Sequence, residues 1–310
     1  MENMMRGIYP VLVTPFTENN EIDVADLCKQ VEFAIEAGAH GLVPTVNAGE
    51  CSLLDDDERQ LVVETVIKQT NKRVPVVVGI AAKADEQAVK YAVHAQSAGA
   101  DAIMSMPPYV AKCSPPQAVE YYKMIDAAID IPFFIQNFFA PLGTPLPAAM
   151  LYNVIRDCKT AQYMKEESGC PSQLITELLK LLEKNPIDHF KGIFGGLGGS
   201  MMIHETFRGA CGCMPAPHLT DVFVDVWELL ESGKNEEAIS LHNKLLPAIT
   251  FDGAYGVSGW KAILKYRGVI SNDKARRGGG VRFDERNYVE LDQCMSRLAP
   301  LMRVKGGNVH

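Results

Sequence analysis

Lys165 has the clearest capacity for chemistry in this sequence, because it ends a short apolar run, residues 161–165 (AQYMK). We predict that this run is a strand and that the lysine stands at its carboxyl end. Desolvation at that position disfavours the ammonium form and frees an amine that attacks carbonyl carbons. The pattern therefore predicts a lysine that forms an imine with a ketone. The alternative is a strand-end cation that Glu166 and Glu167 neutralise.

The elements that must position this lysine repeat along the chain. Short β-rich runs alternate with amphipathic runs about eight times, roughly every 30 residues, as in the βαβ units of a parallel sheet. Eight such units close a barrel, so we predict an α/β protein with a (β/α)₈ (TIM) barrel. Gly38 and Gly99 end two of the helical runs, where a left-handed C-cap is expected. The predicted strands are residues 8–13, 41–45, 74–80, 102–106, 132–136, 161–165, 189–194 and 210–214.

The pattern changes near residue 220, where strand signals stop. Four helical runs follow, at residues 222–230, 236–246, 259–266 and 286–298. Because no flexible Gly/Ser linker precedes them, we expect an appendage on the barrel and not an independent domain. The predicted division is a barrel with the active site over residues 1–220 and a C-terminal helical segment over residues 221–310.

Composition excludes several classes of protein. The chain has 310 residues, of which 47% are hydrophobic and 22% are charged, as in a globular protein. A formal net charge of −8 argues against nucleic acid as a partner. The start is too short and polar for a signal peptide, and no apolar run is long enough to span a bilayer. We therefore predict a cytoplasmic protein that binds neither nucleic acid nor membrane.

Neither a metal nor a cofactor is predicted. The eight cysteines are scattered and are expected to be reduced thiols. Cys211 and Cys213 form a single close pair without a second pair or a spaced histidine, which is weak support for a metal site. The glycine-rich run at residues 195–199 lacks the context of a nucleotide-binding fold. We interpret it as a tight turn after a strand.

The predicted strand ends carry the candidate site, because barrel chemistry takes place in the loops that follow the strands. The loop of residues 46–50 (VNAGE) can bind a carboxylate through its backbone N–H groups. Residues 106–109 (MPPY) end another strand, and Gln136 and Asn137 end the next. Tyr163, two residues before Lys165, is expected on the same inward face, with a place in the barrel core as the alternative.

Five segments together resemble the dihydrodipicolinate synthase and N-acetylneuraminate lyase family, over essentially the whole chain. They are residues 7–16 (GIYPVLVTPF), 49–50 (GE), 107–109 (PPY), 165–166 (KE) and 209–212 (GACG). The resemblance implies a TIM barrel with a C-terminal helical segment and class I aldolase-type chemistry. It also implies a Schiff base between Lys165 and a 2-oxo acid, and a homotetramer or homodimer.

Three departures from the family pattern bear on the reaction. Asn47 and Ala48 stand where the family usually has two hydroxylated residues, Gln136 replaces a proton-relaying tyrosine, and Val110 replaces a second tyrosine. An amide does not titrate near neutral pH, so it does not relay protons as a phenol does. Gln136 is expected to hold a substrate hydroxyl without deprotonating it. The missing proton relay favours elimination of water over aldol cleavage. The pattern of Gln136 and Asn137, with Asn47 in the earlier loop, is similar to the 2-keto-3-deoxy-L-arabonate dehydratase branch.

The predicted reaction is therefore that of a hydro-lyase. The substrate carboxylate docks on the amides of Ala48 and Gly49, and Lys165 condenses with the ketone. Loss of a proton from carbon 3 and of the carbon 4 hydroxyl as water converts 2-keto-3-deoxy-L-arabonate to 2-oxoglutarate semialdehyde. Lys165 and Gln136 are the predicted catalytic residues. The predicted substrate-binding residues are Asn47, Ala48, Gly49, Asn137, Tyr109 and Tyr163.

Three alternatives stay open. They are a pyruvate-dependent aldolase or synthase of the dihydrodipicolinate synthase type, a hydroxypyrroline-carboxylate deaminase, and a non-catalytic sugar-acid binder. A buried lysine is costly unless it has a function, which argues against the non-catalytic binder. The group that shuttles protons also stays open, among the released Lys165 amine, an ordered water and a carboxylate.

Overall fold

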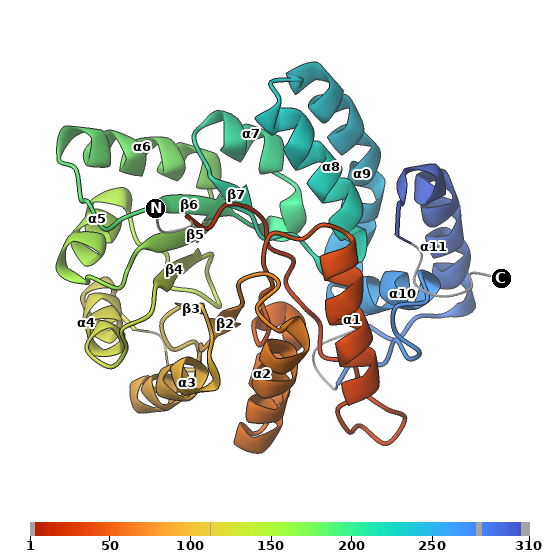
Figure 1. Cartoon of the computed structure of the whole chain (residues 1–310), viewed down its shortest axis with the longest axis horizontal. Helices are drawn as coiled ribbons and strands as arrows, with labels where there is room; N and C mark the ends of the chain where they lie inside the picture. The colour runs from red at the N-terminus through yellow and green to blue at the C-terminus, as the bar shows by residue number, and fades with distance from the viewer. Residues whose placement is uncertain (1–3, 112, 277–280, 305–310) are drawn as a thin grey trace. The chain divides into compact units, whose positions relative to one another are not determined.

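The computed structural model describes residues 4–111, 113–276 and 281–304 (Figure 1). The chain forms two compact units. The first comprises Met1–Arg6, Pro75–Leu197 and Met201–Met214, and the second comprises Gly7–Val74, Gly198–Ser200 and Pro215–His310. The boundary near residue 220 stays a prediction.

The first unit contains a parallel sheet with strands adjacent in chain order. These strands are β2 (Val77–Gly79), β3 (Ala102–Ser105), β4 (Phe133–Phe138), β5 (Tyr163–Glu167), β6 (Gly192–Gly195) and β7 (Gly212–Cys213). The last six of the eight predicted strands are therefore confirmed. The helices of this unit are α3 (Asp85–Ala98), α4 (Pro115–Asp126), α5 (Ala148–Asp157), α6 (Pro171–Lys184) and α7 (Met202–Phe207). Each helix follows a strand, which is the βα order of a parallel sheet (Figure 1).

The register of β4 and β5 places their polar ends next to each other. Gln136 pairs with Lys165, and Phe134 pairs with Tyr163 nearer the start of both strands. All five residues of β5 are buried, although three of them are charged. Buried charges need partners, so this strand end is where interactions between side chains must be dense.

In the second unit, the two predicted strands that begin the chain pair only briefly. β1 is limited to Gly7–Ile8, and the second predicted strand contributes an isolated parallel bridge between Val11 and Val43. Pro10 has no N–H to donate to a ladder, and Thr45 has a φ of +55°, which ends an extended run. The predictions of full strands at residues 8–13 and 41–45 are therefore wrong, although the two segments are parallel where they pair.

The helices of the second unit are α1 (Val24–Glu36), α2 (Asp56–Thr70), α8 (Thr220–Glu231), α9 (Asn235–Tyr255), α10 (Val257–Tyr266) and α11 (Glu285–Leu298). The last four confirm the helical runs predicted after residue 220. The helix α9 runs past Pro247, which the sequence analysis placed outside it, because Leu245, Ala248 and Ile249 are all buried.

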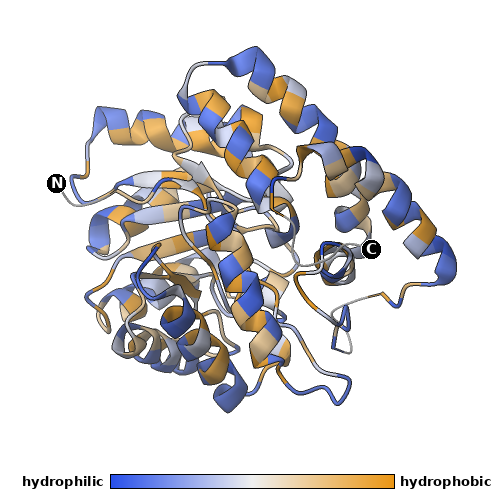
Figure 2. Ribbon diagram, turned by 45° about the vertical axis from the view of Figure 1, so that its right-hand side comes forward, coloured by the Kyte–Doolittle hydropathy of each residue, from blue (hydrophilic) through white to orange (hydrophobic). Residues whose placement is uncertain are grey.

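Local signals at the helix ends match the prediction where it was made. Gly99 is the left-handed C-cap of α3 with a φ of +96°, and Gly38, just after α1, has a φ of +87°. Figure 2 shows hydrophobic and hydrophilic residues side by side along the helices, as expected for helices with one buried face. Within the described ranges, every helix falls short of the length and apolarity needed to cross a bilayer.

Candidate active site

Lys165 is the middle residue of β5, which continues to Glu167, so the prediction that the lysine ends its strand is wrong; its side chain is only 4% exposed. Its Nζ is 3.0 Å from Glu167 Oε2, so the lysine is buried, as predicted, but is paired with a carboxylate. The two residues are two apart on one strand, which puts their side chains on the same face. From the sequence, Glu167 was predicted only as a neutralising charge, although its i, i+2 spacing from Lys165 indicates a side chain on the same face of the strand.

Glu167 is held by three donors. Its Oε2 accepts a hydrogen bond from Gln136 Nε2 at 2.9 Å in addition to the contact with Lys165, and its Oε1 accepts one from the Leu197 amide at 2.9 Å. A Cβ atom at Gly196 would lie 2.3 Å from Glu167 Oε1, so the glycine is needed for the carboxylate to fit. Gly196 and Leu197 of the glycine-rich run at residues 195–199 therefore support Glu167, which gives this run a role in addition to the predicted turn.

Asn137 supports a different carboxylate. Its Nδ2 donates to Glu166 Oε2 at 2.8 Å and to the Leu146 carbonyl oxygen at 3.2 Å, and its Oδ1 accepts from the Leu146 amide. Burial raises the pKa of Glu166 to about 7, although hydrogen bonds from Ser168 and Asn137 favour the ionised form. The structure thus brings Gln136 to the lysine pair and Asn137 to the neighbouring Glu166. Substrate binding by Asn137 stays a prediction.

The two tyrosines predicted to bind substrate occupy different surroundings. Tyr163 is 1% exposed, its ring stacks on Phe134 with centroids 4.6 Å apart, and its hydroxyl accepts a hydrogen bond from the Met5 amide at 2.8 Å. These contacts are those of a core residue, the alternative that the sequence left open. Tyr109 is half-buried in the turn that follows β3. A substrate role for either tyrosine stays a prediction.

The loop predicted to bind a carboxylate forms a 3₁₀ turn, Asn47–Gly49, in the second unit. The Gly49 amide donates to the Val46 carbonyl oxygen at 2.9 Å, so docking a carboxylate on it requires a shared hydrogen bond. Ala48 is buried, and the buried Asn47 Nδ2 has no hydrogen-bond partner among the described residues. The Asn47 amide is therefore a donor available to an acceptor group.

Glu50, which follows this turn with a φ of +54°, is fixed by a buried network inside the second unit. Its Oε1 is 2.5 Å from Lys261 Nζ, and its Oε2 accepts from the Arg276 amide at 2.7 Å. Lys261 is fully buried, and its Nζ also donates to the Lys274 carbonyl oxygen at 2.9 Å. Lys261 was not predicted as part of this network, because its position in an amphipathic helix carries no sign of burial.

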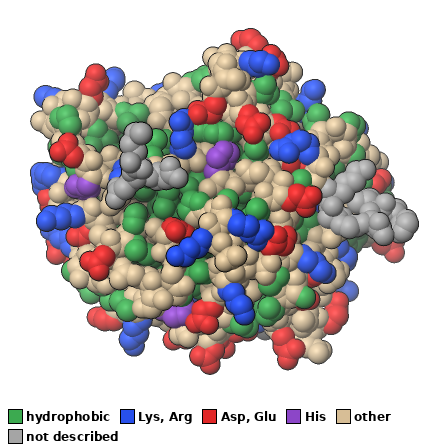
Figure 3. All heavy atoms as spheres, in the orientation of Figure 1, with side chains coloured by type: hydrophobic (Ala, Val, Ile, Leu, Met, Phe, Trp, Pro, Cys, Tyr) green, Lys and Arg blue, Asp and Glu red, His purple; other side chains and the backbone are tan. Residues whose placement is uncertain are grey.

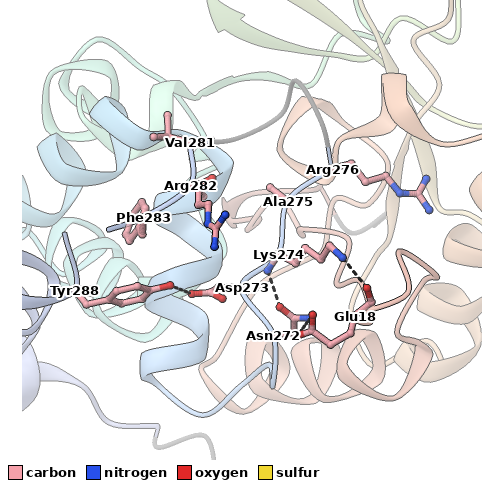
Figure 4. Close-up of a pocket in the computed structure, with 11 residues that line it drawn as sticks. Glu18, Asn272, Asp273, Lys274, Ala275, Arg276, Val281, Arg282, Phe283 and Tyr288 are labelled. Atoms are coloured by element: carbon pink, nitrogen blue, oxygen red, sulfur yellow. Dashed lines mark hydrogen bonds between the residues drawn. The ribbon is translucent and has the colours of Figure 1, made fainter. Parts of the chain in front are cut away.

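A cavity of about 630 Å³ lies in the same unit, beside residues 272–276. Figure 4 shows Tyr288 and Asp273 pointing toward each other, with their oxygens 2.8 Å apart, and Lys274 reaching the carbonyl oxygen of Glu18 at 2.6 Å. These residues, which line the cavity, therefore form hydrogen bonds with one another. On the face drawn in Figure 3, acidic and basic side chains are likewise interspersed.

Comparisons with known proteins agree with the resemblance. A family model described as the dihydrodipicolinate synthetase family matches residues 4–294. An L-2-keto-3-deoxyarabonate dehydratase from Azospirillum brasilense is 29% identical over 275 residues, which cover 87% of each chain. A 4-hydroxy-tetrahydrodipicolinate synthase from Rhizobium meliloti is 29% identical over 245 residues, which cover 79% of this chain and 82% of the relative.

The fold is shared with solved structures of the same family. The crystal structure of dihydrodipicolinate synthase from Rhodopseudomonas palustris matches with a TM-score of 0.88 and 26% identity, over 94% of this chain and 97% of that one. This confirms the predicted (β/α)₈ barrel with a C-terminal helical appendage. The protein is accordingly an aldolase-type lyase, and the chain belongs to the dihydrodipicolinate synthetase family.

Proposed function

We propose that this protein is a Schiff-base-forming hydro-lyase that dehydrates a 2-keto-3-deoxy sugar acid, with 2-keto-3-deoxy-L-arabonate as the substrate. The observation that carries the proposal is the single carboxylate oxygen of Glu167 that contacts both Lys165 and Gln136. A carboxylate beside the imine-forming lysine supplies a base where the family pattern has a phenol. Similarity to the dehydratase from Azospirillum brasilense supports the choice of substrate.

The contacts suggest how the first bond forms. At 3.0 Å, the Lys165 ammonium can pass a proton to Glu167, which leaves a neutral amine to attack carbon 2 of the substrate. Glu167 then returns the proton to the hydroxyl of the carbinolamine, which leaves as water, so that a protonated imine and an ionised Glu167 result. Because Lys165 and Glu167 are both buried, this transfer neutralises two charges without solvent.

Elimination of water then needs one group that takes a proton and returns it. Ionised Glu167 takes a proton from carbon 3, and the electron pair moves toward the imine nitrogen to give an enamine. The enamine expels the carbon 4 hydroxyl, which leaves as water with the proton that Glu167 returns. Loss of a proton from carbon 5, tautomerisation and hydrolysis of the imine release 2-oxoglutarate semialdehyde and free Lys165. Gln136 keeps Glu167 in place during these steps.

Reduction with borohydride in the presence of a 2-oxo acid tests the imine. We expect pyruvate to be trapped on the peptide that contains Lys165, and no trapping in the Lys165→Met variant. Lys159→Met, which removes an exposed lysine before the same strand, is the matched control and should trap pyruvate normally. Trapping on another lysine would exclude the proposed mechanism, and release of pyruvate from the sugar acid would show aldol cleavage instead of dehydration.

A tyrosine at position 136 tests why the amide is there. We expect Gln136→Tyr to raise aldol cleavage of the sugar acid, because the phenol restores a proton relay at the end of β4. Gln136→Phe has the same size without the hydroxyl and should not raise it. Pyruvate release, measured by a coupled assay, distinguishes the two variants. Equal rates in both would contradict the role given to Gln136.

A synthase activity is the second candidate, because the relative from Rhizobium meliloti is as similar in identity as the dehydratase. Product analysis by mass spectrometry separates it from dehydration, since a synthase joins pyruvate to an aldehyde and releases no semialdehyde. Assembly as a homotetramer or homodimer stays a prediction, as does a cytoplasmic location.

A further inference from the structure

Glu205, on α7, has a buried carboxyl group to which the mechanism assigns no role. The side chain is 1% exposed, and neither carboxylate oxygen has a hydrogen-bond partner among the described residues. An unpaired charge is costly to bury, so a carboxyl group in this position keeps its proton. Burial raises the pKa of Glu205 to about 8, and Glu167 and Glu166 contribute to the rise.

The carboxyl group of Glu205 lies at the end of β6, where Glu167 is also held. A Cβ atom at Gly195 would be 1.8 Å from Glu205 Oε2, and one at Gly196 would be 2.3 Å from Glu167 Oε1. The two carboxyl groups therefore contact consecutive glycines, and a side chain at either position would displace one of them. Gly195 also pairs with Glu166 of β5 and with Cys213 of β7, so these strands surround the site.

The charged groups that act on Glu205 come from β5. Cys213 of β7 also faces Glu205, and the charge of Glu205 adds to the burial that raises the pKa of this thiol well above its usual value. Neither β6 nor the buried face of α6 supplies an ionisable side chain, and His204 on α7 itself is exposed. The groups from β5 are Lys165, Glu166 and Glu167.

We infer that Glu205 is a positioning residue that keeps a proton beside the Lys165–Glu167 pair, so that this pair holds one positive and one negative charge. The inference rests on the proposed function, because it concerns the proton that Lys165 must lose. An ionised Glu205 would place another negative charge near the lysine and stabilise its ammonium form. A protonated Glu205 adds no such charge, so Lys165 loses its proton more readily as the pH rises. Glu205 thus acts through the pair and not on the substrate.

The test is the pH dependence of imine formation, followed as borohydride trapping of pyruvate between pH 6 and pH 10. Glu205→Gln and Glu205→Leu both keep the side chain at position 205 uncharged at every pH. We expect wild type and variants to agree below about pH 7. Above about pH 8 the wild-type rate should level off as Glu205 ionises, while both variants continue to rise and exceed it about tenfold by pH 9. Glu177→Gln, on the exposed face of α6, should follow wild type throughout.

Each outcome decides between the roles. A variant rate that is lower by the same factor at every pH would mean that Glu205 only supports the fold, and coincident profiles would mean that it has no effect on the lysine. Either result overturns the inference while leaving the proposed function intact, provided that wild type traps pyruvate on Lys165. Failure of wild type to trap a 2-oxo acid would remove the proposed function and this inference together.

Discussion

Replacing Glu167 with glutamine is expected to lower kcat for dehydration by about 10²–10⁴-fold, the contribution of a well-placed general base. Glutamine keeps the size of the side chain and can still contact Lys165, but it cannot take a proton from either the lysine or carbon 3. The step is measured directly as exchange of the methyl protons of pyruvate for deuterium, since this exchange requires imine formation and removal of a carbon 3 proton. Exchange should slow by a similar factor.

Two controls separate this effect from damage to the site. Glu183→Gln removes an exposed carboxylate from α6 and should exchange protons at the wild-type rate. Borohydride should still trap pyruvate on Lys165 in Glu167→Gln, although more slowly, because the nucleophile is unchanged. Exchange at the wild-type rate in Glu167→Gln would mean that another group is the base, and the mechanism would then have to begin from that group.

Replacing Lys261 with methionine is expected to lower the free energy of unfolding by about 3–5 kcal/mol, because it leaves the buried Glu50 carboxylate without its cation. The lysine also contacts the ring of Phe16, with Nζ 4.3 Å from the centroid, and methionine keeps part of that packing. Unfolding in urea, followed by circular dichroism, measures the change. The pair lies within one compact unit, so local loss of the Asn47–Gly49 turn should accompany it.

Lys265, one turn later on α10, is the matched control. Its Nζ is 3.0 Å from Asp273 Oδ1, but its side chain is 44% exposed, so Lys265→Met should cost less than about 1 kcal/mol. The double variant Glu50→Gln with Lys261→Met removes both charges and should recover more than half of the loss. Equal costs at positions 261 and 265 would show that the buried charge is not what stabilises this loop.

The fold was predictable because its signals are local. Apolar runs and helical periodicity located six strands of the first unit and four helices after residue 220, and Gly99 marked the end of α3. Two errors have causes that compete with these signals, one of them local and one from tertiary packing. Pro10 and Thr45 shorten the pairing at the start of the chain, whereas burial of Leu245 and Ile249 carries α9 through Pro247.

The site was predictable only in part, because its contacts join residues that are distant in the sequence. The strand that carries Lys165 follows from its own apolar run, and Gln136 was recognised from its position on the neighbouring strand. Glu205 is forty residues beyond Lys165, on a helix of six residues, and nothing in its neighbourhood indicates that it is buried. Glycines 195 and 196 were interpreted as a turn. The structure shows why glycine is required there, because two carboxyl groups occupy the space that a side chain would need.

The division of the chain between the two units has a consequence for how the protein is made. The second unit needs residues from the beginning of the chain and residues beyond 215, whereas the first unit needs the opening segment and residues up to 214. During translation, the N-terminal stretch must therefore wait for partners that leave the ribosome last. The Met5 amide donates a hydrogen bond to the hydroxyl of Tyr163 on β5. A tag or deletion at the amino terminus would therefore disturb a segment that a strand of the sheet holds in place.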